Sequence, residues 1–371
     1  MKTYCINLDR RPERLADFQK QEMPGEFVRV PAVDGKTIPI PATWKVDSGG
    51  GWGSLQSHIK ALELALDARD EHFLICEDDA RWHPTFPAFL SAFTRELPLD
   101  WEYANFGGYP VQFPEPLMGV TCRIASHNWI ECVAYSRAGA RKVLEALRKG
   151  AVDANRWADT IHAEINHNMK AYSPVLPVVG QDRRWSDNHG GPVAPRYTSS
   201  FLRGWFSDEE GRGYLHEVMR LPAGRIVEVG SYRGRSAAWA GMGAAAVGST
   251  LLCVDLWKDA KDARSGFEWG VWRSGMFARS WKPVITPVQC DSREAAKCFE
   301  DGSLMGVFID AEHTYEEVKK DLLAWLPKVK SGGTIMGHDF KMDGHPGVER
   351  AVLEFVGAPD RTYGTVWART V

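Results

Sequence analysis

Short apolar runs alternate with amphipathic stretches along the whole chain, and this alternation predicts an α/β protein. In the first half, strands are expected over residues 3–8, 27–30 and 72–76. Between the last two, Ser57 is expected to cap a helix whose apolar residues recur at i, i+3 and i+7 on one face. The third strand runs directly into three acidic residues.

The second half shows the same alternation, with a glycine turn after its first strand. An apolar strand is expected over residues 225–230, an alanine-rich helix over 237–247, and a strand over 250–255 that ends in a carboxylate. Strand, glycine turn, helix, strand and acid is the order of a doubly wound βαβ unit. This half is therefore expected to be a Rossmann-like domain that binds a cofactor with a ribose.

A seam between the two halves is expected at residues 186–195, which are polar and rich in glycine and proline. The chain has 371 residues, and at roughly 100–200 residues per domain this length indicates two domains. We therefore predict a first domain over residues 1–195 and a second over 196–371. Each is long enough to bury its own core.

The composition excludes several classes of protein. It has 44% hydrophobic and 25% charged residues, as in ordinary globular proteins, and no run approaches the ~18 apolar residues of a membrane-spanning helix. Charges close to the N-terminus argue against a signal peptide, and seven scattered cysteines predict free thiols in a reducing cytoplasm. A pI near 6.4 argues against a broad nucleic-acid-binding surface.

The acidic triplet Glu77, Asp78 and Asp79 is the strongest chemical signal in the first half. Three carboxylates at the end of a strand repel one another unless a cation holds them. A divalent ion gripped there can clamp the diphosphate of a nucleotide sugar and stabilise it as it leaves. The alternative is a solvated turn or helix cap after a strand.

Several motifs of the first half follow one another in a recognisable order. They are residues 4–15, 27–35, 57–58, 74–80 and 135–144, followed by Asp153 and residues 173–187. In this order they resemble the family 25 glycosyltransferases, over about residues 1–190. The resemblance implies a GT-A-like fold, a UDP-sugar donor, Mn²⁺ or Mg²⁺, and transfer with inversion at the anomeric carbon.

The resemblance also implies roles for individual residues. Glu77 and Asp79 match the metal-binding acidic motif, and Asp153 matches an acidic position that implies acceptor binding or a general base. The positions expected near the donor are Asn7, Asp34, His58 and Asp78. Residues 49–56 depart from the family's pattern, which leaves the donor sugar open.

The glycine turn of the second half reads Glu-x-Gly-x-x-x-Gly-x-Ser, not the Gly-x-Gly-x-x-Gly of dinucleotide-binding proteins. An acid before the first glycine repels a pyrophosphate and attracts an ammonium group, so the pattern favours S-adenosylmethionine (SAM) over NAD. Asp255 is placed to reach a ribose, and Asp291 the adenine amine. The expected cofactor-binding residues are Glu228, Gly230, Gly234, Ser236, Asp255 and Asp291.

Two further strands of the second half end in polar groups, Asp310 with His313 close behind, and His338 with Asp339. Parallel strands present ligands at their C-terminal edge, so these residues should gather at one rim. Residues 222–357 resemble class I SAM-dependent sugar O-methyltransferases of the macrocin and mycinamicin type. The resemblance implies Mg²⁺ on Asp310 and Asp339, and His313 as the base.

Two features of this half leave alternatives open. His338 stands where that family often has an acid, and an imidazole prefers softer ions than Mg²⁺. His313 is expected to be a neutral imidazole with a pKa near 6.5 at cytoplasmic pH. The aromatic insert 256–287, with Trp257, Trp269 and Trp272, is expected to be a lid over the cofactor, or else a satellite core.

Together these patterns predict a cytoplasmic, bifunctional enzyme of glycan assembly. The first domain would transfer a sugar from a nucleotide sugar, and the second would methylate a sugar hydroxyl. A glycan or glycolipid acceptor would allow peripheral contact with a membrane. The alternatives are a second domain that only positions substrate, or an enzyme that tailors a glycosylated natural product.

Overall fold

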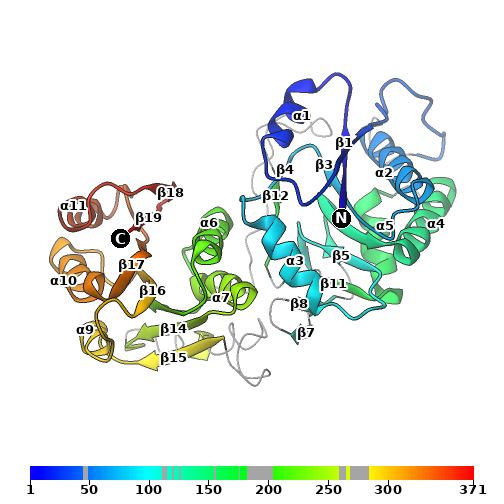
Figure 1. Ribbon diagram of the computed structural model, residues 1–371. Coiled ribbons are helices and arrows are strands. Elements are labelled where there is room, and N and C mark those ends of the chain that lie inside the picture. The colour runs from blue at the N-terminus through cyan, green and yellow to red at the C-terminus, as the bar shows by residue number, and fades with distance from the viewer. Residues whose placement is uncertain are drawn as a thin grey trace. The chain divides into compact units, whose positions relative to one another are not determined.

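The computed structural model describes residues 1–44, 49–110, 115–118, 121–124, 127–153, 156–174, 176–181, 204–258, 265–267 and 284–371. The chain divides into two compact units, Met1–Leu117 with Thr121–Tyr197, and Met118–Val120 with Thr198–Val371. Figure 1 shows the first in blue to green and the second in green to red. The predicted boundary near residue 195 lies outside the described residues.

The first unit is built on an eight-stranded mixed sheet. In sheet order its strands are β2 (Phe27–Pro31), β1 (Lys2–Asn7), β3 (His72–Glu77), β10 (Cys132–Ser136), β5 (Tyr103–Asn105), β11 (Ala171–Pro174), β8 (Thr121–Arg123) and β7 (Glu115–Met118). Strands β1, β2 and β3 are parallel, and β10 runs antiparallel to both of its neighbours, β3 and β5. The acidic triplet therefore begins at the carboxyl end of a central strand.

Helices cover this sheet, and two small strand pairs flank it. The helices are α1 (Pro12–Gln19), α2 (Gly50–Asp67), α3 (Phe86–Glu96), α4 (Arg137–Asp153), α5 (Ala158–Ile165) and the 3₁₀ helix η1 (Asn166–Asn168). The pairs are β4 (Ala80–Arg81) with β12 (Gly180–Gln181), and β6 (Tyr109–Pro110) with β9 (His127–Asn128). Leu62 of α2 and Leu147 of α4 belong to one core with Ile75 of β3.

The predicted start of the second helix at Ser57 is wrong. Helix α2 begins at Gly50, after Gly49 in the left-handed region with a φ of 106°. Ser57 lies inside the helix, where its hydroxyl donates a hydrogen bond to the Gly53 carbonyl at 2.7 Å and accepts one from the Val33 amide. Residues 49–53 are rich in glycine, which disfavours helix interiors, so the local pattern carries no sign of this earlier start.

The second unit contains a seven-stranded sheet, which confirms the prediction of an α/β fold. In sheet order its strands are β15 (Ile285–Gln289), β14 (Thr250–Asp255), β13 (Arg225–Val229), β16 (Leu304–Ile309), β17 (Val329–Gly337), β19 (Val366–Thr370) and β18 (Arg361–Tyr363). The first five are parallel, and β19 is antiparallel to both neighbours. The chain passes outward from β13 on one side, then returns to β16 on the other. This reversal is where doubly wound sheets bind ligands.

Helices cover both faces of this sheet. They are α6 (Asp208–Arg220), α7 (Arg235–Val247), α9 (Ser292–Ala296), α10 (Tyr315–Trp325), the 3₁₀ helix η2 (Leu326–Lys328) and α11 (Pro346–Phe355). Figure 1 shows α6 and α7 on one face, and α9, α10 and α11 on the other. Val227, Val307 and Ile335 of the sheet share a core with Leu322 and Val352 of α10 and α11. Among the described residues, no helix combines the length and apolar character needed to cross a bilayer.

Candidate active site

The glycine turn after β13 brings two strand ends into close contact. Gly230 has a φ of 87°, and a Cβ there would lie 2.0 Å from the carbonyl oxygen of Asp310. Gly234, with a φ of 78°, precedes the first residue of α7. Only glycine permits this approach, so the turn opens the N-terminus of α7 toward the rim of the sheet.

A cavity of about 1160 Å³ lies at this rim, where β13, β14, β16 and β17 end. Its volume exceeds the range of ordinary small-molecule pockets, so it can hold a cofactor and part of a second substrate. The predicted site residues that line it are Gly230, Ser236, Asp255, Asp291, Asp310, His313, His338 and Asp339. Gly234 and Glu228 are not on its wall.

Asp255 fixes the shape of the glycine turn. Its carboxylate accepts hydrogen bonds from the backbone amides of Tyr232 at 2.8 Å and Trp257 at 2.7 Å. The Trp257 indole in turn donates to the Tyr232 carbonyl at 2.7 Å. Tyr232 and Trp257 both have positive φ, at 43° and 47°, a strained conformation that persists only where its surroundings enforce it.

Two other predicted cofactor residues lie in different surroundings. Asp291 caps α9 by accepting from the backbone amides of Arg293 and Glu294, and the Arg293 side chain lowers its pKa. Glu228 is fully buried beneath the turn, where the Ser236 hydroxyl donates to it at 3.2 Å. Burial raises the pKa of Glu228 to about 8. Direct contact between an ionised Glu228 and a cofactor ammonium therefore has no support in the structure.

The predicted rim residues Asp310, His313, His338 and Asp339 come together in one cluster. His313 Nε2 lies 2.9 Å from Asp339 Oδ2 and 3.8 Å from Asp310 Oδ1. His338 Nδ1 lies 3.2 Å from Asp339 Oδ1 and 3.5 Å from Asp310 Oδ1. Both carboxylates thus lie between two imidazoles.

The expectation of a neutral His313 with an ordinary pKa is wrong for this arrangement. The neighbouring carboxylates of Asp310 and Asp339 raise the pKa of His313 to about 10. Burial lowers the pKa of His338, but the nearby carboxylates of Asp310 and Glu210 outweigh this effect and raise the pKa to about 10. At neutral pH both rings are cations, so His313 accepts a proton only after another cation takes its place beside the aspartates.

The donor atoms of this cluster suit a divalent ion. Among the described residues, two groups of three ligand atoms lie within 4.8 Å of one another: Asp310, His338 and Asp339, and His313, Asp339 and His345. Two carboxylates and an imidazole match the preferences of divalent cations. The predicted ligands Asp310, His338 and Asp339 thus form one group.

Glu210 and His345 were not foreseen from the sequence. Glu210 accepts hydrogen bonds from the amide and hydroxyl of Thr365, and its Oε1 lies 3.4 Å from His338 Nε2. It also completes a capping box with Ser207 at the start of α6. The Ser-x-x-Glu spacing signals that cap, but it carries no sign of the contact with His338.

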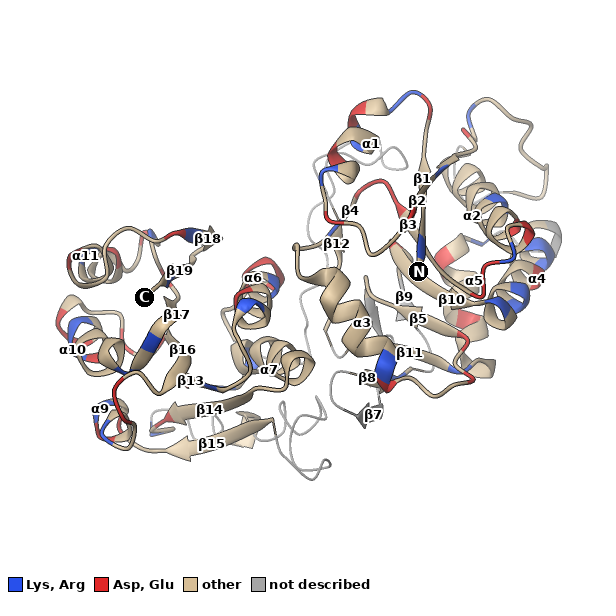
Figure 2. Ribbon diagram, viewed as in Figure 1, with Lys and Arg blue, Asp and Glu red and all other residues tan. Residues whose placement is uncertain are grey.

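The acidic triplet of the first unit is held by the chain's own donors. Asp78 and Asp79 are buried, and Figure 2 shows the acidic run that follows β3. Asn7 donates to Asp78 at 2.7 Å, and Arg14 Nη1 lies 3.2 Å from Asp78 and 3.9 Å from Asp79. Gln181 donates to Asp79 at 3.2 Å. An arginine therefore takes part of the role that was predicted for a metal.

A cavity of about 130 Å³ adjoins this triplet. It is lined by Asp34, Glu77, Asp78 and Asp79 together with Arg10, Arg14 and Lys36. Arg10 pairs with Asp34 at 2.7 Å and lowers its pKa. Burial raises the pKa of Asp78 and, more strongly, of Asp79. In the described part of the chain, the triplet does not contribute to any group of three converging ligand atoms.

The remaining predicted residues lie elsewhere. Asn7 donates a hydrogen bond to Asp78, and His58 is buried with its Nε2 atom 3.3 Å from Glu77 Oε1. Neither residue lines the cavity. Asp153 ends α4, and its side chain lies outside the described residues, as do Trp269 and Trp272. Trp257 is 8% exposed, packs on Phe267 and also lines the cavity, while most of the insert 256–287 lies outside the described residues.

Residues 227–340 match the model of a family described as "Methyltransferase domain". The match includes the glycine turn, Asp255 and the cluster of Asp310, His313, His338 and Asp339. The second unit thus contains a methyltransferase domain. No curated protein matches the chain.

Several solved structures resemble part of the chain. CalS11, a TDP-rhamnose 3′-O-methyltransferase of calicheamicin biosynthesis, is 15% identical, with 44% of this chain and 78% of that chain covered and a TM-score of 0.36. TomG of Streptomyces achromogenes, solved with SAM, is 16% identical, with 46% and 82% covered and a TM-score of 0.36. An O-methyltransferase of Bacillus cereus is 16% identical, with 43% and 72% covered and a TM-score of 0.34.

Proposed function

We propose that the second unit is a SAM-dependent O-methyltransferase that acts on a sugar hydroxyl. The observation that carries the proposal is the cluster of two aspartates and two histidines on the wall of the cavity that begins at the glycine turn. The cavity is large enough for a cofactor, and the cluster on its wall offers groups that can bind a cation or accept a proton. The family match supports the same chemistry.

The cofactor would lie across the glycine turn. A ribose fits beside Asp255, because the carboxylate is held at the edge of the cavity by two backbone amides. The adenine would lie toward Asp291 and α9, on the same wall. Pyrophosphate recognition is disfavoured, because the chain lacks the Gly-x-Gly-x-x-Gly spacing at this turn.

Methyl transfer would use His313 as the proton acceptor. SAM would supply the methyl group: the acceptor oxygen would bond to the methyl carbon, and S-adenosylhomocysteine would leave with the electron pair of the broken sulfur–carbon bond. The hydroxyl proton passes to His313 Nε2. A divalent ion held by Asp310, His338 and Asp339 would lower the pKa of the hydroxyl. Such an ion would also replace the positive charge beside the aspartates, which leaves His313 free to accept the proton.

A sugar acceptor is supported by the sequence resemblance of residues 222–357 to sugar O-methyltransferases. It is also supported by an aromatic surface on the cavity wall. The Trp205 side chain is 86% exposed and stacks on Tyr232, with ring centroids 5.3 Å apart and an interplanar angle of 14°. Flat aromatic faces bind the apolar face of a sugar ring. The second face of Trp205 is available for this contact.

The test is release of S-adenosylhomocysteine by the full chain, supplied with SAM, a divalent cation and a panel of methyl glycosides. We expect release that depends on both glycoside and cation. Turnover of catechols with no turnover of any glycoside would reject the sugar acceptor, and no turnover of any hydroxyl would reject the proposal.

A second candidate function belongs to the first unit, namely transfer of a sugar from a UDP-sugar donor with Mn²⁺ or Mg²⁺. The observation that favours it is the cavity where Asp34 and the acidic triplet meet Arg10, Arg14 and Lys36. Cations suit a diphosphate, and carboxylates suit ribose hydroxyls or an ion. The domains 1–195 and 196–371 would then act in sequence on one glycan, and tethering would raise the effective concentration of the intermediate.

UDP release from a panel of UDP-sugars, with and without Mn²⁺, tests this candidate. Asp79→Asn should abolish UDP release. Wild-type protein that releases no UDP from any donor would leave the second unit as the only enzyme, with the first as a substrate-positioning module. If the protein methylated a glycosylated natural product but no glycan, the result would favour an enzyme that tailors natural products.

A further inference from the structure

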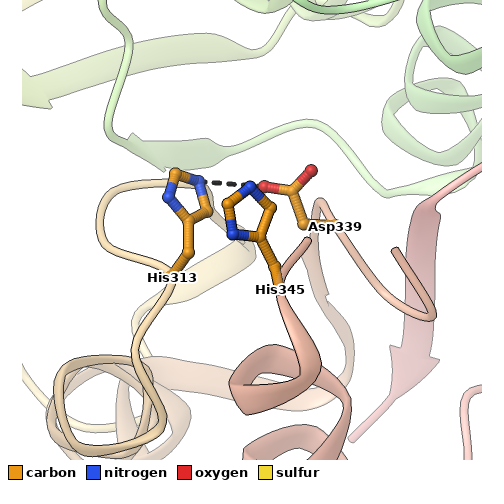
Figure 3. A group of neighbouring side chains, drawn as sticks. All are labelled: His313, Asp339 and His345. Carbon is orange, nitrogen blue, oxygen red and sulfur yellow. Dashed lines mark ion pairs between the residues drawn. The ribbon is translucent and has the colours of Figure 1, made fainter. Parts of the chain in front are cut away.

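The second group of ligand atoms, His313, Asp339 and His345, differs in chemistry from the first. Figure 3 shows the two imidazoles side by side next to the Asp339 carboxylate. One ligand atom of each residue lies within 4.8 Å of the others, and the two rings stack with centroids 4.3 Å apart. Two imidazoles and one carboxylate form the donor set of zinc sites that keep a position for water.

Two consecutive hydrogen-bonded turns link Asp339 to His345. The Met342 amide donates to the Asp339 carbonyl at 3.3 Å, and the His345 amide donates to the Met342 carbonyl at 2.9 Å. His345 is the residue immediately before α11, so the helix anchors it. The backbone between the two ligands is therefore held by hydrogen bonds of its own.

His313 is fixed against His345 by a close backbone contact. A Cβ on Gly347, in the first turn of α11, would lie 2.5 Å from the Tyr315 amide nitrogen and 3.0 Å from the His313 carbonyl oxygen. The first turn of α11 thus packs directly on the segment that carries His313. This contact sets the spacing of the two imidazoles before any ion binds.

We propose that His313, Asp339 and His345 bind Zn²⁺, and that this ion inhibits methyl transfer. All three side chains line the cavity, and the His313 side chain is 38% exposed, so an ion can reach them. Asp339 uses Oδ2 toward His313 and Oδ1 toward His338, so the two groups of ligands lie on opposite oxygens of one carboxylate. Mg²⁺ prefers oxygen ligands, whereas imidazoles favour Zn²⁺.

The inhibition rests on the proposed function of His313, whereas the binding does not. Zn²⁺ bound to His313 Nε2 occupies the lone pair that accepts the hydroxyl proton. No bond of SAM or of the acceptor changes, so the effect is reversible by a chelator. The account predicts that Mg²⁺ supports turnover and that Zn²⁺ blocks it at the same cavity.

The binding test is calorimetric titration of the full, SAM-free chain with Zn²⁺ and separately with Mg²⁺. We expect one Zn²⁺ per chain whose affinity falls at least about 10-fold in His345→Gln. Gly347→Ala, which keeps all three ligands but moves α11, should also weaken Zn²⁺. His167→Gln, an exposed histidine of the first unit, and Cys298→Ser, an exposed thiol, should bind Zn²⁺ as wild type does.

The proposal would be overturned if the wild type bound no Zn²⁺, or if wild type and His345→Gln bound Zn²⁺ equally with an unchanged melting temperature. Loss of Zn²⁺ binding in Cys298→Ser alone would assign the ion to that thiol and would also reject the proposal.

The inhibition test measures S-adenosylhomocysteine release at saturating Mg²⁺ with rising Zn²⁺, each variant normalised to its own zinc-free rate. We expect the inhibitory Zn²⁺ concentration to rise in His345→Gln by the same factor as the dissociation constant. Zinc that binds through His345 without slowing turnover would overturn the inhibitory role. Wild type that binds zinc but never turns over would reject the proposed function and leave the zinc site standing.

Discussion

In both units aspartates lie just beyond the carboxyl end of a β-strand, yet different groups neutralise them. In the first unit, Arg14 and Asn7 lie against Asp78, and burial raises the pKa of Asp79. In the second, Asp310 and Asp339 are paired with histidines on the wall of a cavity of about 1160 Å³. A guanidinium keeps its charge at every accessible pH, whereas an imidazolium gives up its proton when a metal ion arrives.

The positive charge beside the first cluster is a guanidinium and is permanent, whereas the positive charge beside the second is on imidazoles and can be lost with a proton. The first cavity, at about 130 Å³, is small and already contains its cations. The cluster of the second unit pairs its aspartates with titratable imidazoles and lines a much larger cavity. An acid at the end of a strand is therefore an incomplete signal, because the group that pairs with it decides what it can do.

The largest effect is expected from loss of His313. His313→Ala should reduce methyl transfer by roughly 10²–10⁴-fold, because the acceptor hydroxyl would lose the proton acceptor that we propose for it. The affinity for SAM should stay the same, since Asp255 and the glycine turn are untouched. Single-turnover formation of S-adenosylhomocysteine measures the loss, and His167→Ala is the control. Near-normal turnover would move the base to His338 or to water.

The fixed charge of the first unit should be visible in its stability. Arg14→Met leaves the buried carboxylates of Asp78 and Asp79 without their cation, and we expect the free energy of unfolding to fall by about 3 kcal/mol. Arg10→Met removes a more exposed pair with Asp34, and should cost less than about 1 kcal/mol. Urea denaturation of both variants measures the contrast. Equal losses would contradict the account of the triplet as a buried, arginine-compensated group.

A pH dependence is expected from Glu228 in the second unit. Its ordinary pKa of 4.5 is raised to about 8 by burial, so the folded state binds a proton that the unfolded state has lost. Stability should therefore fall as pH rises from about 4.5 to 8, and this part of the slope should vanish in Glu228→Gln. Denaturation at a series of pH values, with exposed Glu209→Gln as the control, measures it. Identical profiles for wild type and Glu228→Gln would show that Glu228 is ionised in the fold.

The smallest effect is expected at Trp205. Trp205→Ala should raise the KM for a glycoside by up to about 10-fold, because the sugar loses one stacking face. The kcat and the dissociation constant of SAM should change little, since the residue touches neither the proton acceptor nor Asp255. Trp205→Phe should restore most of the affinity. An unchanged KM in Trp205→Ala would mean that the acceptor avoids this surface.

Local patterns predicted the elements and strand ends well. The strand predicted over residues 72–76 is β3, and the strand over 250–255 is β14 with Asp255 at its end. The glycine turn and the gathering of Asp310, His313, His338 and Asp339 follow from parallel strands ending at one edge. Each of these features depends only on a short stretch of sequence and on the order of the strands, so it could be predicted.

Contacts between distant segments could not be predicted in this way. Arg14 reaches Asp78 across 64 positions, and Glu210 reaches Thr365 across 155. The burial that raises the pKa of Glu228, and the stacking of His345 on His313, depend on packing that no local pattern encodes. The partners of an acid at a strand end set its chemistry. The positions of both acidic clusters could therefore be predicted from sequence, but the cationic groups that pair with them could not.

The central claim is that the cofactor belongs to the second unit alone, and calorimetric titration of the full chain with SAM tests it most directly. We expect wild type and Asp79→Asn to bind one SAM with equal affinity. We expect Asp255→Asn to lose binding by at least about 10-fold, since Asp255 holds the glycine turn and is the residue proposed to contact the ribose. Circular dichroism would verify that each variant is folded. No binding by the wild type, or loss of binding in Asp79→Asn with full binding in Asp255→Asn, would contradict the account.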